Sequence, residues 1–247
     1  MITNEALVTD VLQINEALRF EAPMRVPTWL PQHHDMGVIV AVVSLVLGQV
    51  LEIMSPRDFL QNPKRWVDML SRRNDDPADV HIYSCIPNFA LDLAARYAAP
   101  ETPDQYDFSG VHCILIGSES VTKPGVEAFV GAFGESGLDR TVLRPSYGLA
   151  EATLLVSTDR TEERPKFIEF DREALADGKA VPAEGGVPMA SIGQPAKWMH
   201  FAIVDTETKN ELPEGEIGEI WVNGNNVAAG YLDRPEETEA TFRNTIG

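Results

Sequence analysis

The sequence predicts an α/β protein with a mainly parallel sheet flanked by helices, followed by a small antiparallel β subdomain. Apolar segments typical of buried strands alternate with helical patterns up to residue 157. These strand segments are apolar on both faces, as in parallel sheets that helices cover. Beyond residue 200, two β segments flank the turn Leu212-Pro213-Glu214-Gly215, which favours antiparallel pairing.

Residues 1–157 form the predicted α/β core subdomain. Leu7, Val11, Ile14 and Leu18 have near-helical spacing and predict an amphipathic helix over 2–19. We expect a loop with prolines at 23, 27 and 31 after it. The expected elements then follow as helix 37–47, strand 49–54, helix 57–73, strand 79–85, helix 88–98, strand 111–116, helix 123–133, strand 141–144 and a turn at 146–148.

The rest of the chain divides into two further predicted parts. Residues 158–190 are polar and contain one strand candidate, 166–170, and one short helix candidate, 172–176. Residues 191–247 are the predicted β-rich subdomain, with strands at 201–205 and 216–222 and a helical segment at 235–242.

Composition and charge exclude several classes of protein. The 247 residues are 44% hydrophobic and 23% charged, as in ordinary globular proteins, so collagen-like, coiled-coil and wholly disordered chains are excluded. The formal net charge of −18 argues against nucleic acid as a partner, since such binding needs a basic surface.

Two features bear on the compartment. Residues 36–51 are a run of 16 uncharged residues, but a spanning helix needs about 20. We therefore expect a buried helix and a buried strand there, with no transmembrane segment. Cys85 and Cys113 lie in apolar strand-like runs and are expected to be buried free thiols, which favours a cytoplasmic location.

Three short stretches contain residues suited to chemistry, and the first is Trp29-Leu30-Pro31-Gln32-His33-His34-Asp35-Met36-Gly37. Adjacent side chains point in different directions and no third ligand cluster is evident, so a metal site is disfavoured. His34 either has a structural role or faces a substrate at the start of a buried helix. Asp35 would complement the N-terminus of that helix.

The second and third stretches each follow an apolar strand. Ile116-Gly117-Ser118-Glu119-Ser120 lies at a strand-to-helix turn, and in open α/β sheets ligands bind at the carboxyl ends of strands. Such a turn also needs a glycine and a polar cap for structural reasons. In the third stretch, residues 146–153, Tyr147 could stack on a planar base, and Glu151 could hold Mg²⁺ on a phosphate.

In this order and spacing the three stretches resemble the adenylate-forming superfamily of acyl and aryl ligases. The segments WLPQHHDMG, SYGLAEATLLVST and LPEGEIGEIWVNGNNVAAGYLDRPEETEATF are most similar to fatty acyl-AMP ligases. Among these, the chain resembles the actinobacterial branch that activates long-chain acids for mycolic-acid synthesis. The resemblance covers nearly all of residues 2–247. It implies ATP-dependent conversion of a long-chain fatty acid to acyl-AMP, followed by transfer to an acyl carrier protein or a polyketide synthase carrier domain.

The resemblance also implies roles for individual residues. The nucleotide-binding positions would be Ser118, Glu119, Ser120, Ser146, Tyr147, Gly148, Leu149 and Ala150, with Tyr147 stacked on adenine. Glu151 would be catalytic and would coordinate Mg²⁺, and the cofactors would be ATP/AMP and Mg²⁺. His34 would be catalytic at the junction of phosphate and acyl pocket, with Met36 and Gly37 in the wall of that pocket. Residues 158–190 match an insertion associated with making acyl-AMP without acyl-CoA.

Some family features differ here. The family pattern Asn-Gly-x-Glu-Pro is replaced by Ile116-Gly117-Ser118-Glu119-Ser120, whereas Ala150 is common among the acyl-AMP ligases. The glycine-rich phosphate loop is not found before Gly37, the first glycine in the chain. The ribose-binding Tyr-x-Thr-Gly-Asp is not found after Phe242, and none of the six lysines matches the catalytic lysine.

We therefore expect a central fragment of the large N-terminal domain of such a ligase, and we expect the isolated chain to be inactive in adenylation. Two alternatives remain. One is a non-catalytic module that binds acyl groups or nucleotides. The other is part of an acyl-CoA ligase or an amino-acid adenylation domain, which Ala150 and the polar segment 158–190 disfavour.

Overall fold

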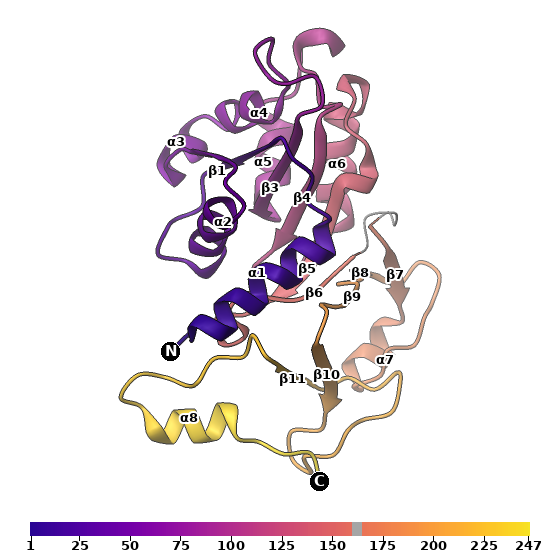
Figure 1. Cartoon of the computed structure of the whole chain (residues 1–247). Helices are drawn as coiled ribbons and strands as arrows, with labels where there is room; N and C mark the ends of the chain where they lie inside the picture. The colour runs from indigo at the N-terminus through magenta and orange to yellow at the C-terminus, as the bar shows by residue number, and fades with distance from the viewer. Residues whose placement is uncertain (160–164) are drawn as a thin grey trace.

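A seven-stranded sheet forms the centre of the computed structural model, which describes residues 1–159 and 165–247 (Figure 1). The strand order is β2-β1-β3-β4-β5-β6-β9. The five parallel strands are β1 (Met24–Thr28), β2 (Val50–Ile53), β3 (His81–Pro87), β4 (Val111–Gly117) and β5 (Leu143–Gly148). Strands β6 (Leu155–Thr158) and β9 (Gln194–Pro195) extend the sheet antiparallel. The predicted mainly parallel α/β fold is confirmed.

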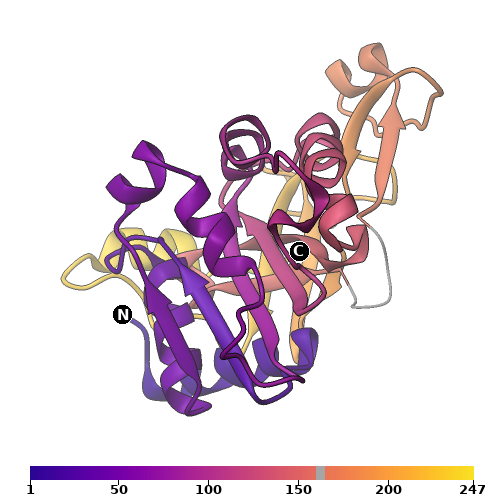
Figure 2. The same ribbon diagram turned by 90° about the horizontal axis from the view of Figure 1, so that it is seen from above.

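Helices cover both faces of the sheet, and Figure 2 shows α1 on one side with α5 and α6 on the other. The helices of this region are α1 (Asn4–Leu18), α2 (Asp35–Val46), α3 (Pro56–Gln61), α4 (Lys64–Leu70), α5 (Phe89–Tyr97) and α6 (Lys123–Phe133). Thr3 caps α1 by accepting the Ala6 N–H, and Thr122 caps α6 by accepting the Gly125 N–H.

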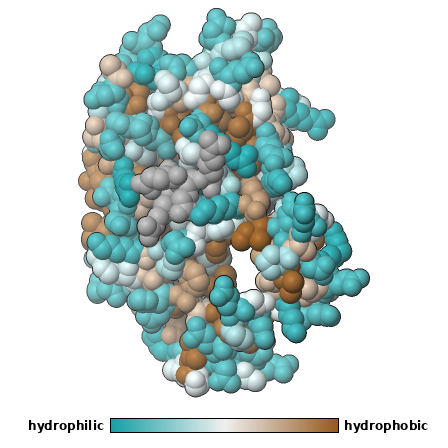
Figure 3. Space-filling view, turned by 90° about the vertical axis from the view of Figure 1, so that its right-hand side faces the viewer, coloured by the Kyte–Doolittle hydropathy of each residue, from teal (hydrophilic) through white to brown (hydrophobic). Residues whose placement is uncertain are grey.

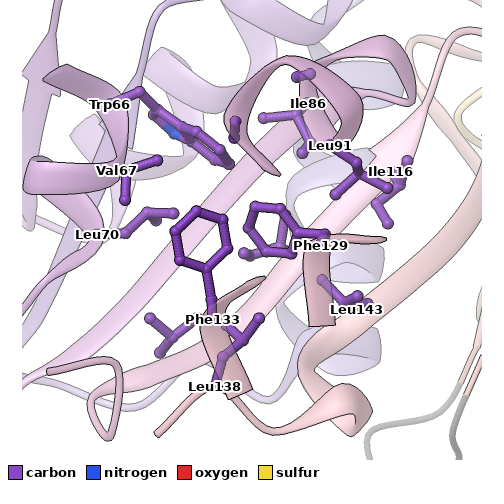
Figure 4. Packing of buried hydrophobic residues seen from close by; sticks show 14 of the residues in the cluster. Trp66, Val67, Leu70, Ile86, Leu91, Ile116, Phe129, Phe133, Leu138 and Leu143 are labelled. Carbon is purple, nitrogen blue, oxygen red and sulfur yellow. The ribbon is translucent and has the colours of Figure 1, made fainter. Parts of the chain in front are cut away.

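The core consists of two apolar clusters, one on each face of the sheet. The larger contains Trp66, Leu70, Phe129 and Phe133, packed against the inner strands (Figure 4). The second joins α1 and α2 to the opposite face and includes Ile14, Ile39, Tyr83 and Leu155. Full burial of one such side chain contributes about 1.5–3 kcal/mol. Apolar burial therefore fixes the sheet and its helices.

The later part of the chain forms smaller units. Strands β7 (Phe167–Phe170) and β8 (Val187–Ala190) pair antiparallel, with α7 (Arg172–Ala176) between them. Strands β10 (Met199–Val204) and β11 (Glu219–Gly224) form a second antiparallel pair, and α8 (Pro235–Phe242) follows. The predicted antiparallel subdomain is thus confirmed. The face of the molecule in Figure 3 is largely hydrophilic, in keeping with the acidic composition.

Three sequence predictions about elements in the first hundred residues are wrong. The segment expected to be a proline-containing loop includes β1, a fully buried strand between β2 and β3. The helix expected over 57–73 is divided into α3 and α4 at Asn62-Pro63, because proline cannot donate the next helical hydrogen bond. The strand expected to be buried at 49–54 is β2, an edge strand with exposed Val50 and Ile53.

Candidate functional site

The three sequence stretches meet at one cavity of about 220 Å³. It lies where β3, β4 and β5 end, beside the start of α2, as expected for ligand sites in parallel sheets. The lining residues are His34, Asp35, Met36, Cys85, Leu115, Gly117, Ser118, Ser146, Tyr147, Gly148, Leu154 and Leu155. We call this space the central cavity.

His34 and Asp35 form the polar start of α2. His34 is the residue before the helix, its side chain is half exposed, and its Nδ1 lies 2.6 Å from Asp35 Oδ1. The same Asp35 oxygen accepts the Met36 N–H at 2.7 Å, which satisfies a free donor of the first helical turn. His34 therefore presents an imidazole to the central cavity from a fixed backbone position.

Met36 and Gly37 have different surroundings. Met36 lines the central cavity and its Sδ accepts a hydrogen bond from Ser118 Oγ. Gly37 lies behind it, where a Cβ atom would be 2.1 Å from the Pro31 carbonyl oxygen. Gly37 thus permits α2 to pack against the preceding loop. It supports the cavity wall and does not line the cavity itself.

A second and larger cavity, of about 810 Å³, lies next to the central one and shares Ser118, Ser146, Tyr147 and Gly148 with it. Glu119, Ser120 and the first residues of α6 also line this space, and residues 187–190 of β8 close it from the other side. We call it the polar groove after the hydroxyls, the carboxylates of Asp92 and Glu119 and the amine of Lys123 on its border, although Val187, Met189 and Ile192 make much of the remaining lining apolar.

Glu119 has a structural contact in addition to its place in the polar groove. Its Oε1 accepts the Phe89 N–H at 2.7 Å, at the start of α5. A carboxylate at this position complements the positive end of the helix. Ser118 before it has a φ of 66°, a backbone conformation rarely adopted by residues other than glycine.

A third cavity is apolar and lies between α1, α2 and β3. It is small, about 40 Å³, and shares Cys85, Leu115 and Leu154 with the central cavity. Its other lining residues are Ile14, Leu18, Phe20, Val26, Ile39, Val40, Val43, Ser44, Tyr83 and Ser84. We call it the apolar groove; a hydrocarbon chain suits such a lining because it makes no demand for hydrogen bonds.

The segment after β5 turns back sharply to form β6. A Cβ atom on Gly148 would lie 2.0 Å from the Leu154 carbonyl oxygen, so only glycine permits this approach. Burial, and then the neighbouring Glu151 carboxylate, raise the pKa of Tyr147 above its usual value. The turn predicted at 146–148 is wrong, because Ser146, Tyr147 and Gly148 all belong to β5. The Ser146 hydroxyl is 2.7 Å from Thr158 Oγ1 on the neighbouring strand.

Leu149, Ala150 and Glu151 lie in the turn itself. The Leu149 N–H donates to Leu154 O at 3.0 Å, and Ala150 begins a short 3₁₀ turn. Glu151 is half-buried, and its Oε1 accepts a hydrogen bond from Tyr231 Oη. None of these three is among the residues that line the three cavities described above.

Sequence reasoning missed Tyr231 and two buried polar residues, Asp10 and Asn226. Asp10 and Asn226 are fully buried, and the Asn226 amide donates a hydrogen bond to the Asp10 carboxylate. Asp10 could have been found, because it interrupts the apolar face of α1 between Leu7 and Ile14. Asn226 and Tyr231 fall within the family-like stretch at 212–242, but spacing alone indicates no partner for them.

Within residues 1–159 and 165–247 there is no group of three or more His, Cys, Asp or Glu side chains arranged to hold a metal. Cys85 and Cys113 are both buried and free, as predicted, and burial raises their thiol pKa values, to about 12 for Cys113. In the same part of the chain, no helix has the length and apolarity needed to cross a membrane.

Comparison with known proteins gives the family. The model of AMP-binding enzymes matches residues 1–232. The chain is 41% identical to the long-chain-fatty-acid–AMP ligase FadD32 of Mycolicibacterium smegmatis over 99% of its own length and 39% of that protein. It is 39% identical to the ligase FadD28 of Mycobacterium tuberculosis, covering 89% of this chain and 37% of the relative.

A solved structure agrees with these relatives. The fatty acyl-adenylate ligase of L. pneumophila, in complex with acyl adenylate and pyrophosphate, superposes with a TM-score of 0.87 and 32% identity. The alignment covers 97% of this chain and 42% of that one. The chain thus spans about two fifths of the length of the relatives it matches. The relative fadD25 of Mycobacterium tuberculosis, named as a fatty-acid–CoA ligase, is 42% identical over 90% of this chain and 37% of that protein. Sequence and fold together assign the chain to the AMP-binding enzyme family, in which its relatives include fatty acyl-AMP ligases.

Proposed function

We propose that this chain provides the acyl and adenine sites of an enzyme that activates a long-chain fatty acid with ATP, giving acyl-AMP and pyrophosphate. The observation that carries the proposal is the adjacency of the three cavities, because the central cavity shares lining residues with both of the others. The apolar groove shares Cys85, Leu115 and Leu154 with the central cavity, which shares four residues with the polar groove. An acyl-adenylate has the same sequence of parts: hydrocarbon, anionic junction and base.

The polar groove would take the nucleotide. Tyr147 would stack on adenine, while the strand-end backbone at Ser118, Ser146 and Gly148 would contact the adenosine. Glu119 and Ser120 border the same space, and Leu149 and Ala150 would support Tyr147 from the turn. His34 would meet the junction between carboxylate and α-phosphate as a hydrogen-bond donor, because it lines the central cavity beside both grooves.

Glu151 would hold the Mg²⁺ that accompanies ATP. A carboxylate oxygen is the hard ligand that Mg²⁺ prefers, and one protein carboxylate suffices when phosphate oxygens and water complete the shell. When bound, the ion would neutralise phosphate charge. Glu151 fits this role in donor type and in its position next to Tyr147.

The acceptor of the acyl group is the finer part of the proposal. From the resemblance of the sequence to fatty acyl-AMP ligases we propose transfer to a thiol of an acyl carrier protein or polyketide synthase carrier domain. The free cysteines support a reducing compartment, and hence the cytoplasm, for this reaction. An acyl-CoA-forming enzyme is the alternative, and it is distinguished by CoA consumption.

Calorimetric titration with dodecanoyl sulfamoyl adenosine, a non-hydrolysable acyl-AMP analogue, tests the proposal. We expect micromolar binding, weakened about fivefold or more by Tyr147→Ala because one base-stacking contact contributes about 1–3 kcal/mol. Tyr97→Ala is the matched control, since Tyr97 is exposed on α5 and lines none of the three cavities. Equal affinities for wild type and Tyr147→Ala would refute the adenine site.

A further inference from the structure

Residues 226–231 follow β11 and contact the turn that contains Glu151, although the two segments are far apart in the sequence. We call them the 226–231 segment. The Ala228 N–H donates to Glu151 O at 2.7 Å, and Thr153 Oγ1 donates to Asn226 O at 2.7 Å. The Tyr231 hydroxyl donates to Glu151 Oε1. Backbone and carboxylate of the same residue are thus held by one segment about 80 residues away in sequence.

The Asn226 side chain anchors this contact in the interior. Its Nδ2 donates to Ala152 O and Leu155 O, each at 2.9 Å, and lies 3.4 Å from Asp10 Oδ1. Asp10 Oδ1 also accepts the Leu155 N–H at 2.9 Å. Because Asn226 and Asp10 are fully buried, the loss of either would leave backbone groups of the turn without partners.

The turn needs such support because its backbone is strained. Thr153 has φ 63° and ψ −60°, a conformation that costs on the order of 1–3 kcal/mol for a β-branched residue. Thr153 lies two residues after Glu151 in the same turn, so its conformation helps to fix the position of the Glu151 Cα atom. A strained residue of this kind persists only when its surroundings fix it.

We propose that Tyr231 and Asn226 are positioning residues for Glu151: Asn226 fixes the turn, and Tyr231 fixes the carboxylate by binding Oε1. Because Tyr231 binds Oε1, the other carboxylate oxygen, Oε2, would be the one that meets the cation. The inference rests on the proposed function, in which Glu151 holds the Mg²⁺ of the nucleotide. Hydrogen bonds to a ligating carboxylate commonly change metal affinity 10–100-fold.

The test is calorimetric titration of the full chain with α,β-methylene ATP, with and without Mg²⁺. The ratio of the two Kd values is the Mg²⁺ effect. Tyr231→Phe removes only the hydroxyl and keeps the ring, which packs edge-on against Phe242 at 5.3 Å. Asn226→Ala removes the buried amide. The controls are Tyr97→Phe and Asn225→Ala, both at exposed positions.

We expect Tyr231→Phe to reduce the Mg²⁺ effect about tenfold while the Kd without Mg²⁺ stays within about twofold of wild type. Asn226→Ala should act in the same direction, and the controls should match wild type. If Asn226→Ala does not fold, Tyr231→Phe still decides. Equal weakening with and without Mg²⁺ would mean that Tyr231 is merely structural, and would overturn the inference.

Glu151→Gln separates this inference from the proposed function. If it abolishes the Mg²⁺ effect while Tyr231→Phe and Asn226→Ala retain it, only the positioning role is wrong. If Glu151→Gln retains the effect, or if the wild-type chain shows none, Glu151 does not hold the cation. The assigned metal role is then overturned, and the positioning inference with it.

Discussion

The sheet core and the region from residue 165 onward are stabilised in different ways. In β3, five of seven residues are buried, whereas β11 has no fully buried residue and α7 and α8 bury none. The core is fixed by apolar contact on both sheet faces. The later region meets it through the pairing of β9 with β6, through a few apolar side chains such as Ala196 and Met199, and through the polar contacts of Asn226, Ala228 and Tyr231. A region can therefore contribute little burial and still determine the shape of a site.

The same substitution in the two regions gives the largest expected contrast. Phe129→Ala on α6 removes a side chain that is 1% exposed, and we expect a loss of about 3–5 kcal/mol in the free energy of unfolding. Phe201→Ala on β10 removes one that is 36% exposed, so the expected loss is about 1 kcal/mol. Urea denaturation followed by circular dichroism measures both. Equal losses would contradict the comparison.

Asp10 joins the two regions, and its titration should sharpen the comparison. Burial raises the pKa of Asp10 from 3.8 to about 7. Since the folded pKa is the higher one, its contribution to stability is full below pH 4 and is lost as pH rises through 7. Asp10→Asn keeps an acceptor for the Leu155 N–H and cannot ionise.

We therefore expect the stability of wild type to fall relative to Asp10→Asn by up to about 1.4 kcal/mol per pH unit between pH 4 and 7. Urea unfolding at four pH values measures the difference. Asp79→Asn, at an exposed position, is the control and should run parallel to wild type. Parallel curves for Asp10→Asn as well would show that Asp10 has an ordinary pKa.

Two glycines give the smallest effects, with opposite signs in the two regions. Gly131 lies in the exposed face of α6 with open space around it, so Gly131→Ala should stabilise the protein by about 0.5–1 kcal/mol. Gly178 follows α7 with φ 77°, also in open space, so Gly178→Ala should destabilise by about 1 kcal/mol through backbone strain. Thermal unfolding should shift upward for the first and downward for the second; shifts of the same sign would contradict this.

Local sequence patterns predicted where the helices and strands of the core lie better than they predicted how deeply each element is buried. The strand and helix pairs around β3, β4 and α6 agree with the sequence to within a few residues. The exceptions have physical causes. Strand β1 contains Pro27, which usually argues against a central strand, yet the Pro27 carbonyl accepts Ser84 Oγ and the strand is fully buried. Strand β2 contains the apolar residues Val50, Leu51 and Ile53, but its position at the edge of the sheet leaves Val50 and Ile53 exposed.

Some features of the candidate site could likewise be predicted from local sequence patterns, and others could not. The position of Ser118 and Tyr147 at strand ends follows from β–α alternation, so their meeting in one cavity could be predicted. Gly37 was predicted as a pocket wall, but only the packing of α2 on Pro31 shows its supporting role. The contacts of Glu151 with Tyr231 and of Asp10 with Asn226 join positions 80 and 216 residues apart, which no local pattern encodes.

By itself the sequence determined the α/β class, the antiparallel subdomain and the residue types of the site, because periodicity and strand-end motifs act over a few residues. Only the tertiary structure decided which strand lies at the edge, which residues the three cavities share and which distant side chains hold Glu151. These depend on burial and on hydrogen bonds between remote segments, whose free energy is gained only once the sheet has brought those segments together.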